Sequence, residues 1–119
     1  MRDFRIEIKT LEEMGKEFVS VWKNAEAGEV PEKPIERVYF EDIYAVTRIL
    51  TPKRLTALKT LHDNGPVSIR ALAKLLKRDY KNVHQDIAVL SGIGLVDKNE
   101  QGLYTAPFDR IHLEIPLAA

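Results

Sequence analysis

Hydrophobic residues recur at helical spacing in three consecutive segments in the middle of the chain. The first segment has Leu55, Leu58 and Leu61 on one face. It is predicted to begin after Thr51, which can cap a helix, and to end at an Asn-Gly-Pro stop at residues 64–66. The second segment begins at Ser68, another capping residue. Its core-facing positions are predicted to be Ile69, Leu72, Ala73, Leu75 and Leu76.

The third segment has two faces of opposite character. Val83, Ile87 and Leu90 repeat at intervals of four and three residues and are predicted to face the core. Asp79 is predicted to cap this helix, and Gly94 is predicted to end it. Counting about 100° per residue from Val83 gives the outward positions. These are Lys81, His84, Gln85 and Ala88.

Two short segments with β-strand character follow the third helix. Residues 95–98 and 103–105 are separated by a polar Asn-Glu-Gln-Gly turn, which predicts a hairpin. Three helices followed by a hairpin is the order of a winged helix-turn-helix. We therefore predict an α+β fold of this kind, in which the third helix lies in a DNA groove.

Further elements are predicted on both sides of this unit. Alternating apolar residues predict a strand at residues 4–9 and another at residues 110–115. We expect the two strands to share a sheet, within one chain or across a dimer, because an exposed apolar strand needs cover. After a connector from Pro31 to Pro34, residues 35–40 are predicted to form a strand and residues 41–50 a helix.

A helix of about four turns is predicted after Thr10, ending near Gly28. Its apolar seam consists of Leu11, Met14, Phe18, Val21 and Ala25. The spacing fits packing onto the same domain and fits a dimer interface equally well. Trp22, beside the seam, is expected to anchor that packing. Residues 1–50 are thus an N-terminal extension, and residues 51–119 are the winged helix with its C-terminal strand, in one compact domain overall.

Three sequences within the chain resemble a known family. They are Leu-Thr-Pro-Lys-Arg-Leu at residues 50–55, Ser-Ile-Arg-Ala-Leu-Ala at 68–73, and Arg-Asp-Tyr-Lys-Asn-Val-His-Gln-Asp at 78–86. From about Tyr39 onward the chain is similar to a small family of predicted winged-helix transcriptional regulators, distantly MarR-like. Some members look like the antitoxins of toxin–antitoxin operons. The resemblance therefore also implies a small toxin protein as a partner.

The chain departs from the family pattern at positions that affect charge and capping. Ala71 stands where a Glu would complete a capping box with Ser68. Gln85 and Ala88 stand where basic residues are usual, which lowers the positive charge of the outward face. Glutamine can nevertheless make a bidentate contact with adenine.

Charge is unevenly distributed along the chain. The 18 basic and 18 acidic residues give a net charge of zero, yet residues 51–90 carry eight basic against three acidic side chains, or +5. Residues 1–50 carry −3 and residues 91–119 carry −2. A positive patch on the predicted DNA-contacting helices can neutralise phosphates, although an ordinary solvated surface gives the same imbalance.

Other features argue against catalysis, metal binding and membrane insertion. The chain has no cysteine, which excludes disulfides and favours the cytoplasm, and it has no apolar run near the ~20 residues of a membrane span. His62, His84 and His112 lie on different predicted elements without metal-ligand spacing. Asp79 and Asp86 are explained as a helix cap and an ion pair on a helix flank. We expect no enzyme, no cofactor and no metal.

These observations predict a sequence-specific DNA-binding transcriptional regulator. We expect a repressor that binds as a homodimer to an inverted repeat in double-stranded DNA, with half-sites one helical turn, ~34 Å, or a multiple apart. Base contacts are assigned to Lys81, His84 and Gln85, flanked by Tyr80 and Asn82. Phosphate contacts are assigned to Lys53, Arg54, Ser68, Arg70, Lys77 and Arg78, with a minor role for Lys98 in the hairpin. The alternative is an antitoxin or assembly module that binds an acidic protein through the same basic face.

Overall fold

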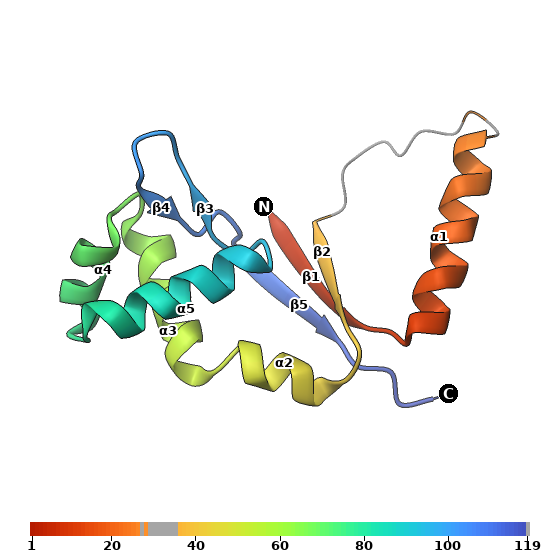
Figure 1. The fold of residues 1–119 in the computed structure, drawn as a ribbon, viewed down its shortest axis with the longest axis horizontal. Helices are drawn as coiled ribbons and strands as arrows, with labels where there is room; N and C mark the ends of the chain where they lie inside the picture. The colour runs from red at the N-terminus through yellow and green to blue at the C-terminus, as the bar shows by residue number, and fades with distance from the viewer. Residues whose placement is uncertain (27, 29–35, 119) are drawn as a thin grey trace.

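The arrangement of the chain is known from a computed structural model that describes residues 1–26, 28 and 36–118. The described residues form an α+β structure with five helices and five short strands. Figure 1 shows helices and a hairpin at one end, a sheet in the middle, and a separate helix, α1 (Leu11–Glu26), at the other end. The connector from Pro31 to Pro34 and the predicted strand start at Ile35 lie outside the described residues.

The three central helices begin where the sequence predicts. They are α3 (Pro52–Asn64), α4 (Ile69–Leu76) and α5 (Tyr80–Gly92). Thr51 Oγ1 accepts a hydrogen bond from the backbone N–H of Arg54 at 3.2 Å, and Ser68 Oγ accepts one from Ala71 at 3.1 Å. These bonds satisfy amides that have no partner inside a helix. The predicted caps at Thr51 and Ser68 are confirmed.

The start and end of α5 differ from each other in how they are capped. Asp79 occupies the cap position, but its side chain makes no capping hydrogen bond, so the expected cap is wrong in that respect. At the other end Gly94 has a φ of +94°, and the N–H of Leu95 donates to the carbonyl of Leu90 at 3.0 Å. This left-handed turn stops the helix as predicted, because only glycine adopts it freely.

The hairpin consists of β3 (Asp97–Lys98) and β4 (Tyr104–Thr105), paired antiparallel. Its strands are shorter than predicted because Leu95 and Val96 are buried in the core instead of pairing with a neighbouring strand. Residue Val67, between α3 and α4, forms a bridge to Tyr104 through hydrogen bonds of 2.8 and 3.1 Å. The hairpin is therefore attached to the segment that precedes α4.

The middle of the molecule is a parallel sheet of three strands in the order β2-β1-β5. The strands are β1 (Asp3–Ile8), β2 (Arg37–Phe40) and β5 (Arg110–Glu114). Phe4 of β1 lies opposite Ile111 of β5, and Ile6 lies opposite Leu113. The predicted sheet between the two ends of the chain is confirmed, and it forms within one chain. Two helices complete the fold, α1 (Leu11–Glu26) and the short α2 (Ile43–Ile49).

One hydrophobic core joins the sheet to the helices. Phe4 and Ile6 of β1 are buried in the same cluster as Leu61, Val83 and Leu90 of the helices. The ring of Phe4 also meets that of Phe108 edge-on, with 4.9 Å between their centroids. Residues 1–50 and residues 51–119 therefore share one hydrophobic core, and each segment buries apolar side chains of the other.

Two apolar predictions need correction. Leu75 was expected in the core but is 50% exposed. Counting 100° per residue, it lies about 100° from the middle of the stripe formed by Ile69, Leu72 and Leu76. Leu113 of β5 and Ile115, which follows β5, are 44% and 48% exposed, and of this apolar alternation only Ile111 packs against the core.

The outer face of the sheet carries a polar cluster. Glu7, one of the polar residues that alternate with the apolar ones in β1, is 9% exposed and accepts a hydrogen bond of 3.3 Å from Arg37 Nη1. Lys9 lies 2.5 Å from Glu17 of α1, and the hydroxyl of Tyr39 donates to Glu17 at 3.0 Å. These bonds connect α1 to the sheet. In residues 1–26, 28 and 36–118, no helix is long and apolar enough to cross a membrane.

Candidate nucleic-acid interface

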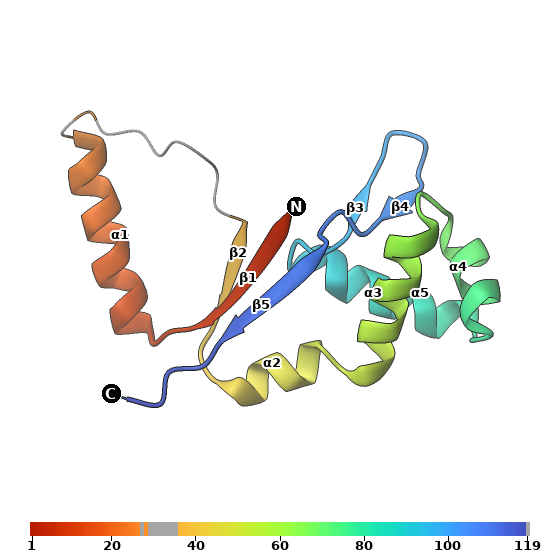
Figure 2. The same cartoon turned by 180° about the vertical axis from the view of Figure 1, so that it is seen from behind.

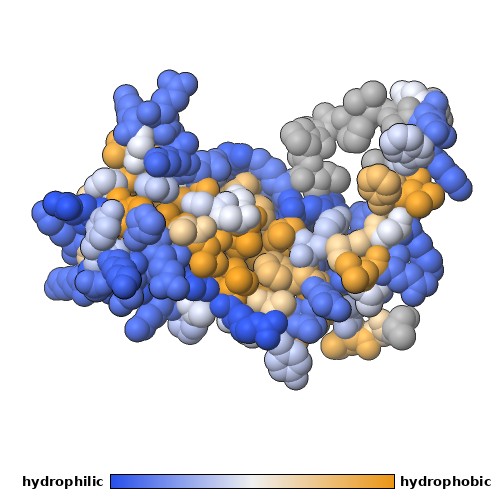
Figure 3. All heavy atoms as spheres, viewed as in Figure 1, coloured by the Kyte–Doolittle hydropathy of each residue, from blue (hydrophilic) through white to orange (hydrophobic). Residues whose placement is uncertain are grey.

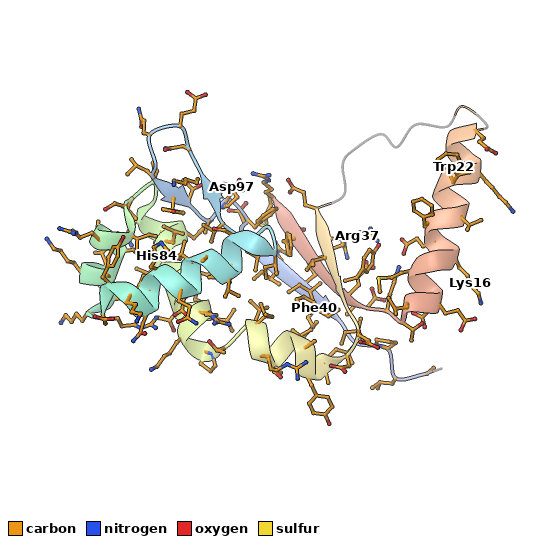
Figure 4. The ribbon with its side chains drawn as sticks, viewed as in Figure 1. Lys16, Trp22, Arg37, Phe40, His84 and Asp97 are labelled. Atoms are coloured by element: carbon orange, nitrogen blue, oxygen red, sulfur yellow. The ribbon has the colours of Figure 1, made fainter. Side chains whose placement is uncertain are left out.

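Helix α5 has one fully buried face and one exposed polar face. Val83, Ile87 and Leu90 are between 0% and 1% exposed. The residues predicted to face outward are all exposed, namely Lys81, His84, Gln85 and Ala88, and so is the flanking Asn82. Figure 4 shows His84 on this helix. The orientation of α5 that the periodicity predicts is therefore confirmed.

The exposed face begins with an aromatic pair. Tyr80 is 49% exposed, and its ring centroid lies 6.0 Å from that of His84, one turn later. The two rings are tilted by 39° and cover the first turn of α5 from one side.

The helical unit consists of α3, α4, α5 and the β3–β4 hairpin. A buried carboxylate fixes α5 against the rest of this unit. Asp86 is 9% exposed, and its carboxylate lies 3.0 Å from Nε of Arg54 and 2.8 Å from Nη2 of Arg78. Arg54 Nη1 also donates to the carbonyls of Arg48 and Ile49 at 3.1 and 3.0 Å. The flank ion pair expected for Asp86 is present, but it is buried and has two partners.

The ion-pair cluster of Asp86, Arg54 and Arg78, here named the clamp, changes the role assigned to Arg54. Its side chain is only 15% exposed, its Nε bonds to Asp86, and its Nη1 bonds to carbonyls at the end of α2. We therefore remove Arg54 from the phosphate contacts. Sequence reasoning missed the burial of Asp86, although its position was a signal, because it lies between Val83 and Ile87 at the border of the apolar face.

Arg78 keeps a donor that the clamp does not use. Its Nη1 is buried and has no hydrogen-bond partner among the described residues. Together with Thr51, Lys53 and Arg54 it lines an open hollow at the start of α3. Asp86 also lines this hollow, and Arg78 Nη1 has no exposed surface, so the structure contradicts the phosphate contact predicted for Arg78. Lys53 is exposed at the hollow and can reach an anion there.

The other predicted phosphate contacts lie on the surface of the same unit. Arg70 and Lys77 are exposed, and Ser68 caps α4 with its oxygen while its hydroxyl proton stays available. In the hairpin, Lys98 lies 5.6 Å above the ring of Tyr104. A shallow cleft between α5 and the hairpin is lined by His84 and Lys98 among others, which brings these two predicted residues together.

Hydrophilic side chains dominate this end of the molecule, as Figure 3 shows over α4, α5 and the hairpin. His62 and His112 lie elsewhere. His62 Nδ1 is 2.7 Å from the carbonyl of Ala106, and His112 Nε2 is 3.2 Å from the carboxylate of Asp3. Both contacts hold chain segments together, and neither histidine belongs to the face of α5.

Comparison with known proteins places the helical unit in a family. The sequence profile of the HVO_A0114 family matches residues 49–113, which is more than half of the chain. The chain belongs to the HVO_A0114 family. In this member the matched part contains all twelve predicted contact residues, whereas β1, α1 and β2 lie outside it. No curated protein and no solved structure matched the chain.

Proposed function

We propose that this protein is a sequence-specific DNA-binding transcriptional regulator. In this proposal α3, α4, α5 and the β3–β4 hairpin form a winged helix-turn-helix. The order of elements supports it: a helix, the bridge at Val67, two helices joined by residues 77–79, and a hairpin. The resemblance of residues 50–55, 68–73 and 78–86 to distantly MarR-like regulators supports the same proposal.

The observation that carries the proposal is the exposed polar face of α5. A helix of this kind fits the major groove, where lysine recognises guanine and asparagine or glutamine recognises adenine through paired hydrogen bonds. Lys81 and Gln85 offer such groups from the first two turns of α5, and His84 adds its ring nitrogens beside them. All three are exposed. Tyr80 and Asn82 flank them.

The clamp at Asp86 supports the same role. Base recognition requires side chains held to within a fraction of an ångström, and this is easiest on a helix whose own position is fixed. Asp86 joins α5 to α3 through Arg54 and to the turn before α5 through Arg78. The face that meets DNA is therefore rigid before binding.

Phosphate contacts come from the cations that remain free. These are Lys53, Arg70 and Lys77, which are all exposed, whereas Arg54 and Arg78 are ion-paired with Asp86. Neutralising about three phosphates per protomer, or about six per homodimer, gives a slope of roughly −5 in a plot of log K against log salt concentration. Lys98 adds a minor contact from the hairpin.

We further propose that the protein acts as a repressor in the cytoplasm and binds as a homodimer to an inverted repeat. A two-fold symmetric protein requires an operator with matching symmetry. Occupation of such a site near a promoter blocks transcription of the adjacent genes.

The test is selection of bound fragments from the genomic DNA of the source organism, at increasing salt, followed by sequencing. We expect enrichment of one inverted repeat. The Lys81→Ala variant should lose this enrichment, whereas Arg5→Ala should keep it, because Arg5 is exposed on the sheet and not on the helical unit. If no sequence is enriched even at low salt, the proposal fails.

A second candidate function is an antitoxin or assembly module. The charge balance favours it: the whole chain is neutral, and Lys98 in the hairpin lies between Asp97 and Glu100. In this case the free cations around α5 bind an acidic surface on a small toxin protein. Lack of DNA enrichment, together with tight binding to the product of the adjacent gene, would support this function over the first.

A further inference from the structure

Helix α1 has an apolar face that the described chain leaves uncovered. Leu11, Phe18 and Trp22 are 76%, 68% and 60% exposed. Counting 100° per residue, these three and Gly15 lie within about 60° of one another around the helix. Three large apolar side chains on one face of a helix normally have a packing partner.

The contacts that hold α1 do not involve this face. Glu17 links the helix to the sheet through Lys9 at 2.5 Å and Tyr39 at 3.0 Å, and its carboxylate also lies 3.7 Å from Arg37. Glu17 lies on a different side of the helix from Phe18 and Trp22. Figure 2, from behind, shows α1 standing apart from the sheet, as Figure 1 does. The own-domain packing that was one of two expectations is therefore absent for Leu11, Phe18 and Trp22. The side chains of Val21 and Ala25 lie outside the described residues.

We propose that α1 pairs antiparallel with α1 of a second copy of this chain. The two-fold axis lies perpendicular to the helices, level with the midpoint between Gly15 and Phe18. A two-fold interface must be self-complementary, since the same surface contributes both sides. In this arrangement Leu11 lies opposite the partner's Trp22, and Gly15 lies opposite the partner's Phe18.

Side-chain size is complementary in this pairing. A Cβ atom built on Gly15 would meet nothing within 4 Å in its own chain, so the space above this residue is open. Glycine inside a helix costs about 1 kcal/mol relative to alanine. Close approach of the partner's Phe18 uses the room that the missing side chain provides. Trp22 already has its indole N–H bonded to Glu26 at 2.7 Å, so its ring can be buried without losing a hydrogen bond.

Charge is complementary as well. The first turn of α1 contains Glu12 and Glu13, and its last turn contains Lys23 and Glu26. Glu12 also lies 3.6 Å from Lys16 of its own helix, and both side chains are exposed. Antiparallel pairing places Glu12 beside the partner's Lys23 on the same flank, and the two-fold axis repeats the pair. Parallel pairing would instead place the acidic turns together, which is unfavourable.

This dimer has a consequence for DNA that, unlike the pairing, rests on the proposed function. α1 and α5 lie toward opposite ends of a molecule whose longest extent is 50 Å (Figure 1). Joining two copies through α1 leaves the two α5 helices at the outer ends. The half-sites of the operator are then more than one helical turn, ~34 Å, apart.

The pairing is tested without DNA, by sedimentation equilibrium of the full chain over a range of concentrations. We expect a monomer–dimer equilibrium whose dissociation constant rises by about tenfold or more in Gly15→Leu, since an added side chain blocks close approach. Leucine forms helix better than glycine, so circular dichroism should show no loss of helix in this variant. The matched control, Ser20→Leu, adds the same side chain at an exposed position on the opposite side of α1 and should dimerise like the wild type.

The single tryptophan gives an independent measurement. Trp22 emission should shift to shorter wavelength as the dimer forms, and Phe18→Ala should abolish the shift at the same concentration. A wild-type protein that stays monomeric throughout would overturn the proposal. Dimerisation without a tryptophan shift, or unchanged in Gly15→Leu, would also overturn it, because the dimer would then use another surface. None of these outcomes depends on whether the protein binds DNA.

Discussion

The carboxylate of Asp86 on α5 lies 3.0 Å from Nε of Arg54 on α3, and both side chains are largely buried. Arg78, from the turn between α4 and α5, contacts the other oxygen of the same carboxylate at 2.8 Å. One acidic group therefore fixes three parts of the helical unit relative to one another. Its removal would leave two arginines close together without a counter-charge.

Asp86→Ala should lower the free energy of unfolding by about 3 kcal/mol, because breaking a buried ion pair leaves the partner charges buried without a counter-charge. Urea unfolding followed by circular dichroism measures the change. Asp63→Ala is the control, since Asp63 is exposed on α3 and its removal should change stability by less than about 0.5 kcal/mol. Similar losses in both variants would show that the clamp does not contribute to stability.

Gln85→Ala should cost about 1 to 3 kcal/mol of binding free energy on the selected operator and much less on random DNA, because Gln85 is assigned to a base. Lys53→Ala should weaken binding to both DNAs alike and reduce the salt slope by about 1, as expected for a phosphate contact. Fluorescence anisotropy at fixed salt measures both. Equal losses of Gln85→Ala on the two DNAs would refute the assignment to a base.

Lys77→Gly should raise the free energy of unfolding by about 0.5 to 1 kcal/mol. Lys77 ends α4 with a φ of 54°, in the left-handed region that a side chain disfavours and glycine does not. Lys74→Gly makes the same chemical change within α4 and should lower stability by up to about 1 kcal/mol. Thermal unfolding of both variants gives the signs, and a loss in Lys77→Gly would contradict the prediction.

The link between α1 and the sheet should depend on pH. The hydrogen bond from Lys9, and then that from Tyr39, lower the pKa of Glu17 below its ordinary value of 4.5. Stability from a lowered carboxyl pKa is present above pH 4.5 and is lost as the pH falls through the folded value. The same bond raises the pKa of Lys9 above 10.5, so its contribution is present below pH 10.5 and is lost as the pH rises beyond the folded value.

Glu17→Gln should therefore be less stable than the wild type at neutral pH, and the difference should disappear in acid. Urea unfolding of both proteins between pH 7 and pH 2 measures it. Glu13→Gln is the control, because Glu13 is exposed and makes no ion pair among the described residues. A difference for Glu17→Gln that persists unchanged to the lowest pH would mean that the carboxylate charge contributes nothing.

Local pattern was sufficient for the helical unit. The repeat of Val83, Ile87 and Leu90 predicted which side of α5 is buried, and the caps at Thr51 and Ser68 marked two helix starts. These features depend on residues within a few positions of one another. Helical periodicity and capping chemistry act at this range, so the sequence reveals them directly.

The tertiary structure decided the features that join distant parts of the chain. Alternation predicted strands at both ends, but only their parallel pairing shows that they form one sheet within one chain. Likewise, Asp86 was visible as a charge on a helix, and its burial followed only from the arrival of Arg54 and Arg78. The exposure of the apolar face of α1 is another feature that only the tertiary structure decided. A sequence fixes which face of an element is apolar, whereas the partner that covers this face depends on long-range packing, which local periodicity does not encode.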